Sequence, residues 1–189
     1  MRLIQRQLYS DHHHFQQLLN CLSKEIDCFD FDNQREANMA IILSALDYLK
    51  VYADQWHHPA EDIIFNHLLE KKIIETKIIK QLLEEHKKIV LETDRINELF
   101  CTAAADCIVS VNKLLDGARN FIKLQRAHLE RENELIYPLM DKLFSEKEWK
   151  EIEIHVKIQA DPLFNKPSKV EYDHLYKYIL ELEDKNEFL

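Results

Sequence analysis

Four long stretches of the chain carry apolar residues at every third or fourth position, and this spacing restricts the fold more than any other feature. The stretches cover about residues 8–26, 46–68, 79–100 and 114–139. Each one presents a single apolar stripe when wound into a helix, which is the pattern of an amphipathic helix. The chain also contains only one glycine, whereas strand-rich domains need more turn residues. We therefore predict an all-α fold, an antiparallel up-down four-helix bundle.

Weaker apolar patterns at about residues 149–156 and 172–182 predict one or two additional short helices after the bundle. This C-terminal part has too few apolar residues to form a core of its own. We therefore expect a single domain over residues 1–189. Residues 1–144 would form the four-helix bundle, and residues 145–189 would form a helical extension packed on it.

Charge and hydropathy exclude several classes of partner. The net charge of −9 at pH 7 argues against nucleic acid and against an anionic membrane surface, since both attract basic patches. The N-terminal residues lack the apolar run of a signal peptide, and no stretch is apolar for long enough to span a membrane. Cys21, Cys28, Cys101 and Cys107 are interpreted as reduced thiols. The sequence therefore predicts a cytoplasmic protein that binds neither nucleic acid nor membrane.

The polar residues that interrupt the four apolar stripes are imidazoles and carboxylates, and every stripe contains at least one histidine. These residues are His12, His57, Glu61, His86, His128 and Glu132. A lone histidine on an apolar stripe is usually a packed residue bonded to a carbonyl, and one His-x-x-x-Glu pair is close to chance. Two such pairs, each one helical turn apart, are harder to explain in that way. Buried carboxylates and imidazoles without partners cost several kcal/mol each, and a metal centre would satisfy all of them.

The type and number of donor atoms favour a dinuclear metal centre. Closed structural zinc sites prefer four ligands, often with thiolate, whereas six nitrogen and oxygen donors on four helices suit two adjacent ions. Imidazole with carboxylate suits iron or manganese, and each glutamate could bridge the two ions. Ferritin-like di-iron bundles use Glu-x-x-His on two helices. That spacing occurs here once, at Glu171 and His174, outside the bundle helices.

Around these residues the sequence resembles the hemerythrin-like, HHE cation-binding family. The similar segments are DHHHFQQLL (Asp11–Leu19), HHPAEDIIF (His57–Phe65), EEH (Glu84–His86) and HLERENELIYPL (His128–Leu139). The C-terminal part resembles a bacterial subgroup of this family through Trp149 and the DPLF segment, Asp161–Phe164. The resemblance thus covers nearly the whole chain.

The resemblance implies a non-haem di-iron centre inside the bundle, with an oxo, hydroxo or water bridge between the two iron ions. Glu61 and Glu132 would be bridging carboxylates. The terminal ligands would be His12, His57, His86 and His128.

Neighbouring polar residues are expected to lie outside the centre. His12 continues the apolar stripe of its helix, whereas His13 and His14 fall on the polar side and are expected to be solvated. His58 and Asp62 repeat the four-residue spacing but lie off the stripe, so we interpret them as outer neighbours of the ligands or as surface residues. Pro59 can kink the helix and rotate its faces, which would change this assignment.

One position departs from the pattern of the oxygen-carrying hemerythrins. These proteins have two histidines one turn apart on the third helix, whereas Val90 follows His86 by one turn in this chain. The departure argues against a five-histidine carrier site. It leaves a coordination position for water, oxygen, peroxide or nitric oxide.

The leading functional hypothesis is a di-iron protein that binds or senses oxygen, nitric oxide or redox state. One alternative is a di-iron oxidoreductase that consumes peroxide or nitric oxide. Another is an interaction module whose metal is only structural, because family membership does not determine the activity. A homodimer contact through Tyr172, Tyr176 and Tyr178 is a further hypothesis.

Overall fold

A computed structural model describes residues 2–29, 36–71, 76–165 and 169–185. No strand occurs in these ranges, and the regular elements there are helices. The predicted all-α class is therefore confirmed.

Two of the bundle helices come from the first part of the chain. The first is α1 (Leu3–Asp27), and its apolar stripe is buried. The second runs without interruption through α2 (Met39–Tyr48), the π-helical segment η1 (Leu49–His57) and α3 (His58–Lys71). It begins where the Asn38 side chain accepts hydrogen bonds from the backbone N–H groups of the first helical turn.

The other two bundle helices follow the same plan of one regular and one interrupted helix. The third is the regular helix α4 (Thr76–Ala104). The fourth consists of α5 (Val111–Arg131), the π-helical segment η2 (Glu132–Ile136) and α6 (Tyr137–Leu143). Between them the chain reverses direction through Asp106, whose φ of 56° lies in the left-handed region that a short polar side chain tolerates.

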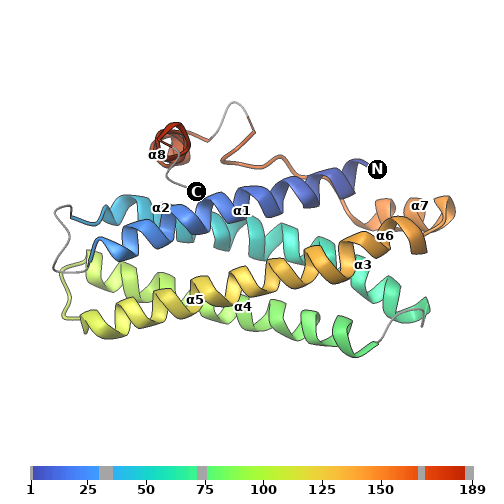
Figure 1. Cartoon of the computed structure of the whole chain (residues 1–189), viewed down its shortest axis with the longest axis horizontal. Helices are drawn as coiled ribbons and strands as arrows, with labels where there is room; N and C mark the ends of the chain where they lie inside the picture. The colour runs from blue at the N-terminus through green and yellow to red at the C-terminus, as the bar shows by residue number, and fades with distance from the viewer. Residues whose placement is uncertain (1, 30–35, 72–75, 166–168, 186–189) are drawn as a thin grey trace.

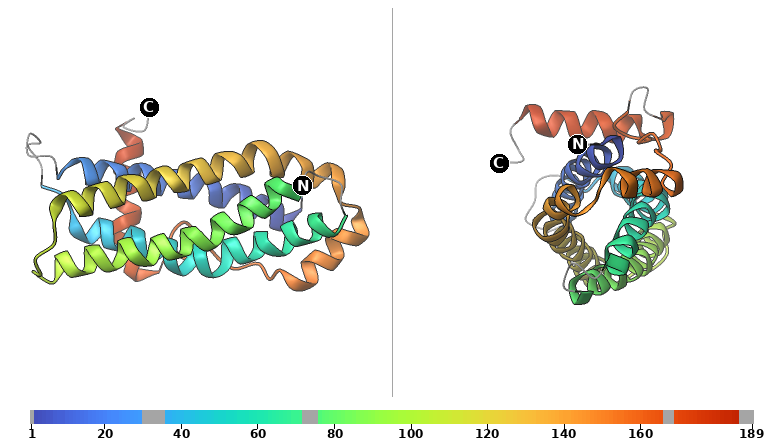
Figure 2. Two further views of the ribbon diagram at one scale, coloured as in Figure 1. Left: turned by 90° about the horizontal axis from the view of Figure 1, so that it is seen from below. Right: turned by 90° about the vertical axis from the view of Figure 1, so that its right-hand side faces the viewer.

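The four helices surround one core, as Figures 1 and 2 show. Helix α1 packs against α2 and α5, and α4 packs against α2 and α5, so each helix has two neighbours in an antiparallel ring. Large side chains from all four helices fill the interior and are at most 1% exposed; examples are Leu19, Ile64, Phe100 and Phe121. These residues lie on the predicted stripes, which confirms the four-helix bundle.

The two π-helical segments have the same local cause. Pro59 and Pro138 have no backbone N–H, and a proline ring crowds the carbonyl group four residues before it. The residue before each proline bonds five residues back instead of four: the N–H of His58 donates to Ala53 O, and that of Tyr137 donates to Glu132 O. Because a π-helical turn contains more residues than an α-helical turn, the faces of both helices rotate beside the interior polar residues.

Two short helices follow the bundle, as predicted. Helix α7 (Glu146–His155) begins with a capping box between Ser145 and Glu148 and packs on α3. After the 3₁₀ turn η3 (Val170–Tyr172), helix α8 (Asp173–Asp184) lies across α1 and α2 (Figure 2).

The three tyrosines considered for a homodimer contact make contacts inside the chain. The Tyr172 hydroxyl donates to Asp47, and the Tyr178 hydroxyl donates to Glu25. The ring of Tyr176 lies 6.2 Å from that of Phe164, measured between centroids. These contacts attach the C-terminal part to the bundle, and the homodimer stays a prediction.

Two further expectations concern the environment of the chain. Within the described ranges, no helix combines the length and apolar character that crossing a membrane requires. No disulfide joins Cys21, Cys28, Cys101 or Cys107, which agrees with their interpretation as thiols.

Candidate metal centre

The six polar residues predicted from the stripes lie together in the bundle interior. They come from all four bundle helices, and none is more than 4% exposed. Nε2 of His12 lies 3.1 Å from Nε2 of His57, although 45 residues separate the two in the chain. The arrangement therefore brings together side chains that are distant in the sequence.

The Glu61 carboxylate faces imidazoles from three different helices. Its Oε1 lies 3.4 Å from His12 Nε2. Its Oε2 lies 3.3 Å from His57 Nε2 and 3.5 Å from His86 Nε2. Glu61 thus lies between a pair of imidazoles on one side and His86 on the other.

The Glu132 carboxylate divides its contacts in the same way. Its Oε2 lies 3.4 Å from His12 Nε2. Its Oε1 lies 3.0 Å from His86 Nε2 and 3.2 Å from His128 Nε2. Each carboxylate therefore spans the space between His12 and His86.

Donor atoms converge closely enough to hold metal ions at two adjacent places. Two groups of residues have this property. In each group, every residue offers one nitrogen or oxygen atom, and these atoms all lie within 4.8 Å of one another. The first group is His12, His57 and Glu61. The second group is Glu61, His86, His128 and Glu132. Because Glu61 belongs to both groups, the two places share a ligand.

The imidazoles of this cluster are oriented from outside. Each points Nε2 toward the carboxylates and directs Nδ1 to an oxygen atom of another side chain. The four Nδ1 contacts are His12 with Asn133 (3.0 Å), His57 with Asp11 (3.0 Å), His86 with Asp62 (2.6 Å) and His128 with Glu85 (3.3 Å). Such outer oxygen partners fix the ring orientation of histidines that bind metals. Asp62 thus contacts His86 from outside the cluster. This position corresponds to the first of the two alternatives for Asp62, an outer neighbour of the ligands.

Three buried atoms of the cluster have no hydrogen-bond partner, which tests whether a metal ion would suit it. They are Glu61 Oε2, Glu132 Oε2 and His128 Nε2. A buried polar atom without a partner costs about 1–3 kcal/mol. All three atoms belong to residues of the donor groups described above, and imidazole and carboxylate are metal-binding side chains. The residues therefore fit a metal site.

The charges of the cluster are strongly coupled. Burial alone would lower the pKa of His57, but Glu61 and Asp11 raise it to about 10. Burial likewise opposes protonation of His86, yet Asp62 and Glu132 raise its pKa to about 10. These imidazoles therefore carry protons that balance the carboxylates, and a metal ion bound at Nε2 must displace those protons.

Tyr137 is a member of the cluster that sequence reasoning missed. Its hydroxyl donates to Glu61 Oε1 at 2.5 Å and lies 2.9 Å from His12 Nε2. Burial and the two glutamates raise the pKa of Tyr137 well above its usual value, so the phenol stays protonated. Regular α-helical spacing points residue 137 away from Glu132, but the π-helical segment η2 turns both toward the interior.

Three further histidines of the first two bundle helices, His13, His14 and His58, were expected to lie outside the centre, and they differ in exposure. His13 is exposed, as predicted. His14 was also expected to be solvated, but it is only partly exposed: its Nδ1 lies 3.0 Å from Asp161 Oδ2, and its ring stacks on Phe164. His58 is only 2% exposed, which excludes the surface alternative. Burial lowers the pKa of His58 to about 4, so this imidazole is neutral.

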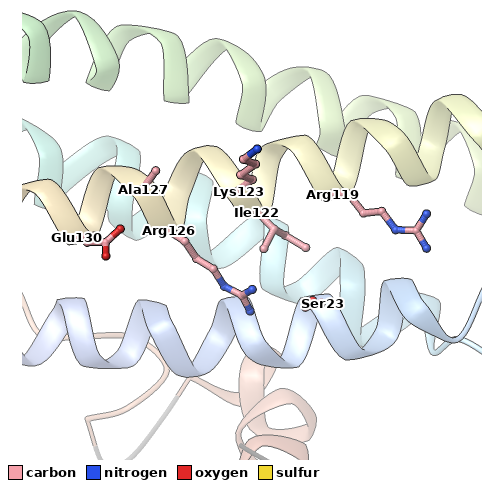
Figure 3. Close-up of a pocket in the computed structure, with 7 residues that line it drawn as sticks. All are labelled: Ser23, Arg119, Ile122, Lys123, Arg126, Ala127 and Glu130. Carbon is pink, nitrogen blue, oxygen red and sulfur yellow. The ribbon is translucent and has the colours of Figure 1, made fainter.

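One surface pocket is separate from this cluster. It lies between α1 and α5 and is lined by Ser23, Arg119, Ile122, Lys123, Arg126, Ala127 and Glu130 (Figure 3). None of these residues belongs to the interior polar cluster, and the pocket is wide open to solvent. This pocket is therefore not the entrance to the metal-ligand cluster.

Comparison with known proteins adds one finding. A family model described as "Hemerythrin HHE cation binding domain" matches residues 3–140. The match extends from the start of α1 into α6, so it covers nearly all of the bundle and every member of the cluster. The comparison with curated proteins returned no match.

Proposed function

Because this chain belongs to the hemerythrin HHE cation-binding family, we propose that it holds two non-haem iron ions in the buried cluster. Glu61 and Glu132 bridge the ions, together with an oxo, hydroxo or water bridge. The terminal ligands are His12, His57, His86 and His128. A di-iron centre of this kind supplies reversible redox chemistry and a place for a small ligand.

The main support for this proposal is that each of the two glutamates contacts histidines on both sides of the cluster. Both Glu61 and Glu132 reach His12 on one side and His86 on the other. A single ion would use only one of these sides. Two ions with shared carboxylates use both, and they also satisfy the buried oxygens that make no hydrogen bond.

The donor atoms favour iron, with manganese as the competing ion. Elemental analysis of protein purified without added metal, together with its visible absorption spectrum, tests the identity. Iron with the absorption of an oxygen-bridged diferric centre supports the proposal. Manganese or zinc as the dominant metal contradicts it.

We propose that this centre binds or senses oxygen, nitric oxide or redox state in the cytoplasm. The cluster is fully enclosed, which suits a diatomic ligand better than a larger substrate. Anaerobic titration of the reduced protein with nitric oxide, followed by absorption and electron paramagnetic resonance, tests this function. A protein that loads two iron ions but gives no change with nitric oxide or oxygen would contradict it.

One observation favours the alternative of a di-iron oxidoreductase. The Tyr137 hydroxyl is a protonated donor in contact with His12 and Glu61, and reduction of peroxide or nitric oxide consumes protons. Steady-state consumption of peroxide or nitric oxide with an excess of reductant separates this alternative from sensing. Many turnovers per chain indicate an enzyme, whereas a single turnover indicates a sensor.

Metal binding should depend on pH and release protons. His57 and His86 have pKa values of about 10 before a metal displaces their protons. Loading at neutral pH should release about two protons or more per chain, and apparent affinity should rise as the pH is raised from about 6 to about 8. Calorimetry in buffers of different ionisation enthalpy measures both quantities. An affinity that is independent of pH, with no proton release, would contradict the assignment of these imidazoles.

A further inference from the structure

His58 lies inside the bundle and faces the second donor group. Its ring stacks on that of His86, with 4.6 Å between centroids, and meets the ring of His128 edge-on at 5.6 Å. One donor atom from each of these three histidines lies within 4.8 Å of the other two. His58 thus forms a third donor group, which shares His86 and His128 with the second group.

The surroundings of His58 repeat those of the four assigned histidines. Its Nδ1 lies 3.2 Å from Asp54 Oδ1, the counterpart of the outer oxygens beside the other rings. The approach is too poorly aligned for a hydrogen bond, so both atoms lack a hydrogen-bond partner. Among the described histidines, the buried ones are His12, His57, His58, His86 and His128. All five direct Nδ1 to an oxygen atom of another side chain.

The π-helical segment explains how two consecutive residues both reach the interior. His57 is the last residue of η1, and the N–H of His58 bonds to Ala53 O, five residues back. His57 then contacts His12 of α1, whereas His58 contacts His86 of α4. The second bundle helix lies between α1 and α4 in the ring, so neighbouring side chains can serve different ions.

We propose that His58 is a further metal ligand, for the ion held by His86 and His128. The proposal rests on the di-iron function above and extends it. The third helix has Val90 one turn after His86, so it offers no second imidazole there. His58 supplies that imidazole from the neighbouring helix. The two ions then differ: one has three imidazoles and the other has two, from His12 and His57.

Two variants test the role of His58. His58→Ala removes the imidazole, and His58→Phe removes the donor atoms but keeps an aromatic ring to stack on His86. If His58 is a ligand, both variants should bind one ferrous ion at least about 100-fold more weakly than the unaltered protein, since outer partners alone give 10- to 100-fold effects. Anaerobic ferrous titration measures the affinities, and circular dichroism checks the helical fold. His155→Ala, at an exposed histidine, is the matched control.

Rescue of metal binding by added free imidazole provides a second test, because a residue that acts only through packing would show no such rescue. It should restore the second ion in His58→Ala, where it can enter the space left by the side chain, and not in His58→Phe. If His58→Phe binds two ions as tightly as the unaltered protein, His58 acts only through packing and the proposal is overturned. If the unaltered protein itself fails to bind two ions, the di-iron function fails instead, so the two failures are distinguishable.

Discussion

Replacing Glu61 with alanine should remove most of the bound metal. Glu61 belongs to both donor groups and faces imidazoles on either side of the centre. Without this carboxylate both ions lose a ligand, and His57 loses one of the two carboxylates that raise its pKa, the other being Asp11. We expect the affinity for each ion to fall by about 100-fold or more. Metal analysis after anaerobic loading with ferrous iron measures the loss.

Glu70 provides a matched control for this variant. It lies on the same helix, α3, but is exposed to solvent. Glu70→Ala should therefore keep the full metal content. Equal metal content in Glu61→Ala and Glu70→Ala would contradict a bridging role for Glu61.

Replacing Asp161 with alanine should have the largest effect on stability outside the metal centre. Asp161 is 3% exposed and holds the segment after α7 against the bundle. Its Oδ2 accepts from the Tyr48 hydroxyl and from His14, and its Oδ1 accepts from the backbone N–H groups of Leu163 and Phe164. Alanine leaves several buried donors without an acceptor, at about 1–3 kcal/mol each.

We therefore expect Asp161→Ala to lower the free energy of unfolding by about 2–4 kcal/mol. Urea unfolding of chelator-treated protein measures this change without a contribution from metal binding. Glu171→Ala, at an exposed acid in the same C-terminal part, should change stability by less than about 0.5 kcal/mol. Equal stabilities of the two variants would show that the C-terminal extension does not depend on this anchor.

The helices and the interior polar residues could be predicted from periodicity. Apolar stripes determine which face of a long helix is buried, so His12, His86 and His128 could be assigned to the interior by their spacing alone. His57 and Glu61 could be assigned in the same way, because they are one turn apart on one face.

The partners of these residues could not be predicted from local spacing. Asp11 contacts His57 across 46 residues of sequence, and Glu85 contacts His128 across 43. Such contacts depend on how the helices are arranged and rotated in the bundle. The periodic pattern of a single helix therefore does not predict these contacts.

The positions of His58 and Tyr137 could not be predicted from regular helical spacing for a different reason. Both residues precede a proline, and both bond five residues back. A prediction that assumes regular α-helical winding gives the wrong face at these positions. The HHP and IYP sequences contain the signal, because proline disturbs the helix before it. The contact of His14 with Asp161 could not be predicted from α1 alone, because Asp161 comes from the C-terminal part.

Anaerobic titration of the metal-depleted protein with ferrous iron, followed by calorimetry and a chelator assay, tests the central claim most directly. Four histidines and two bridging carboxylates predict saturation at about two ions per chain. Glu61→Ala in the same experiment should fail to reach that value. Saturation at one ion, or binding no stronger than that of an unrelated protein without a metal site, would contradict a dinuclear centre in this bundle.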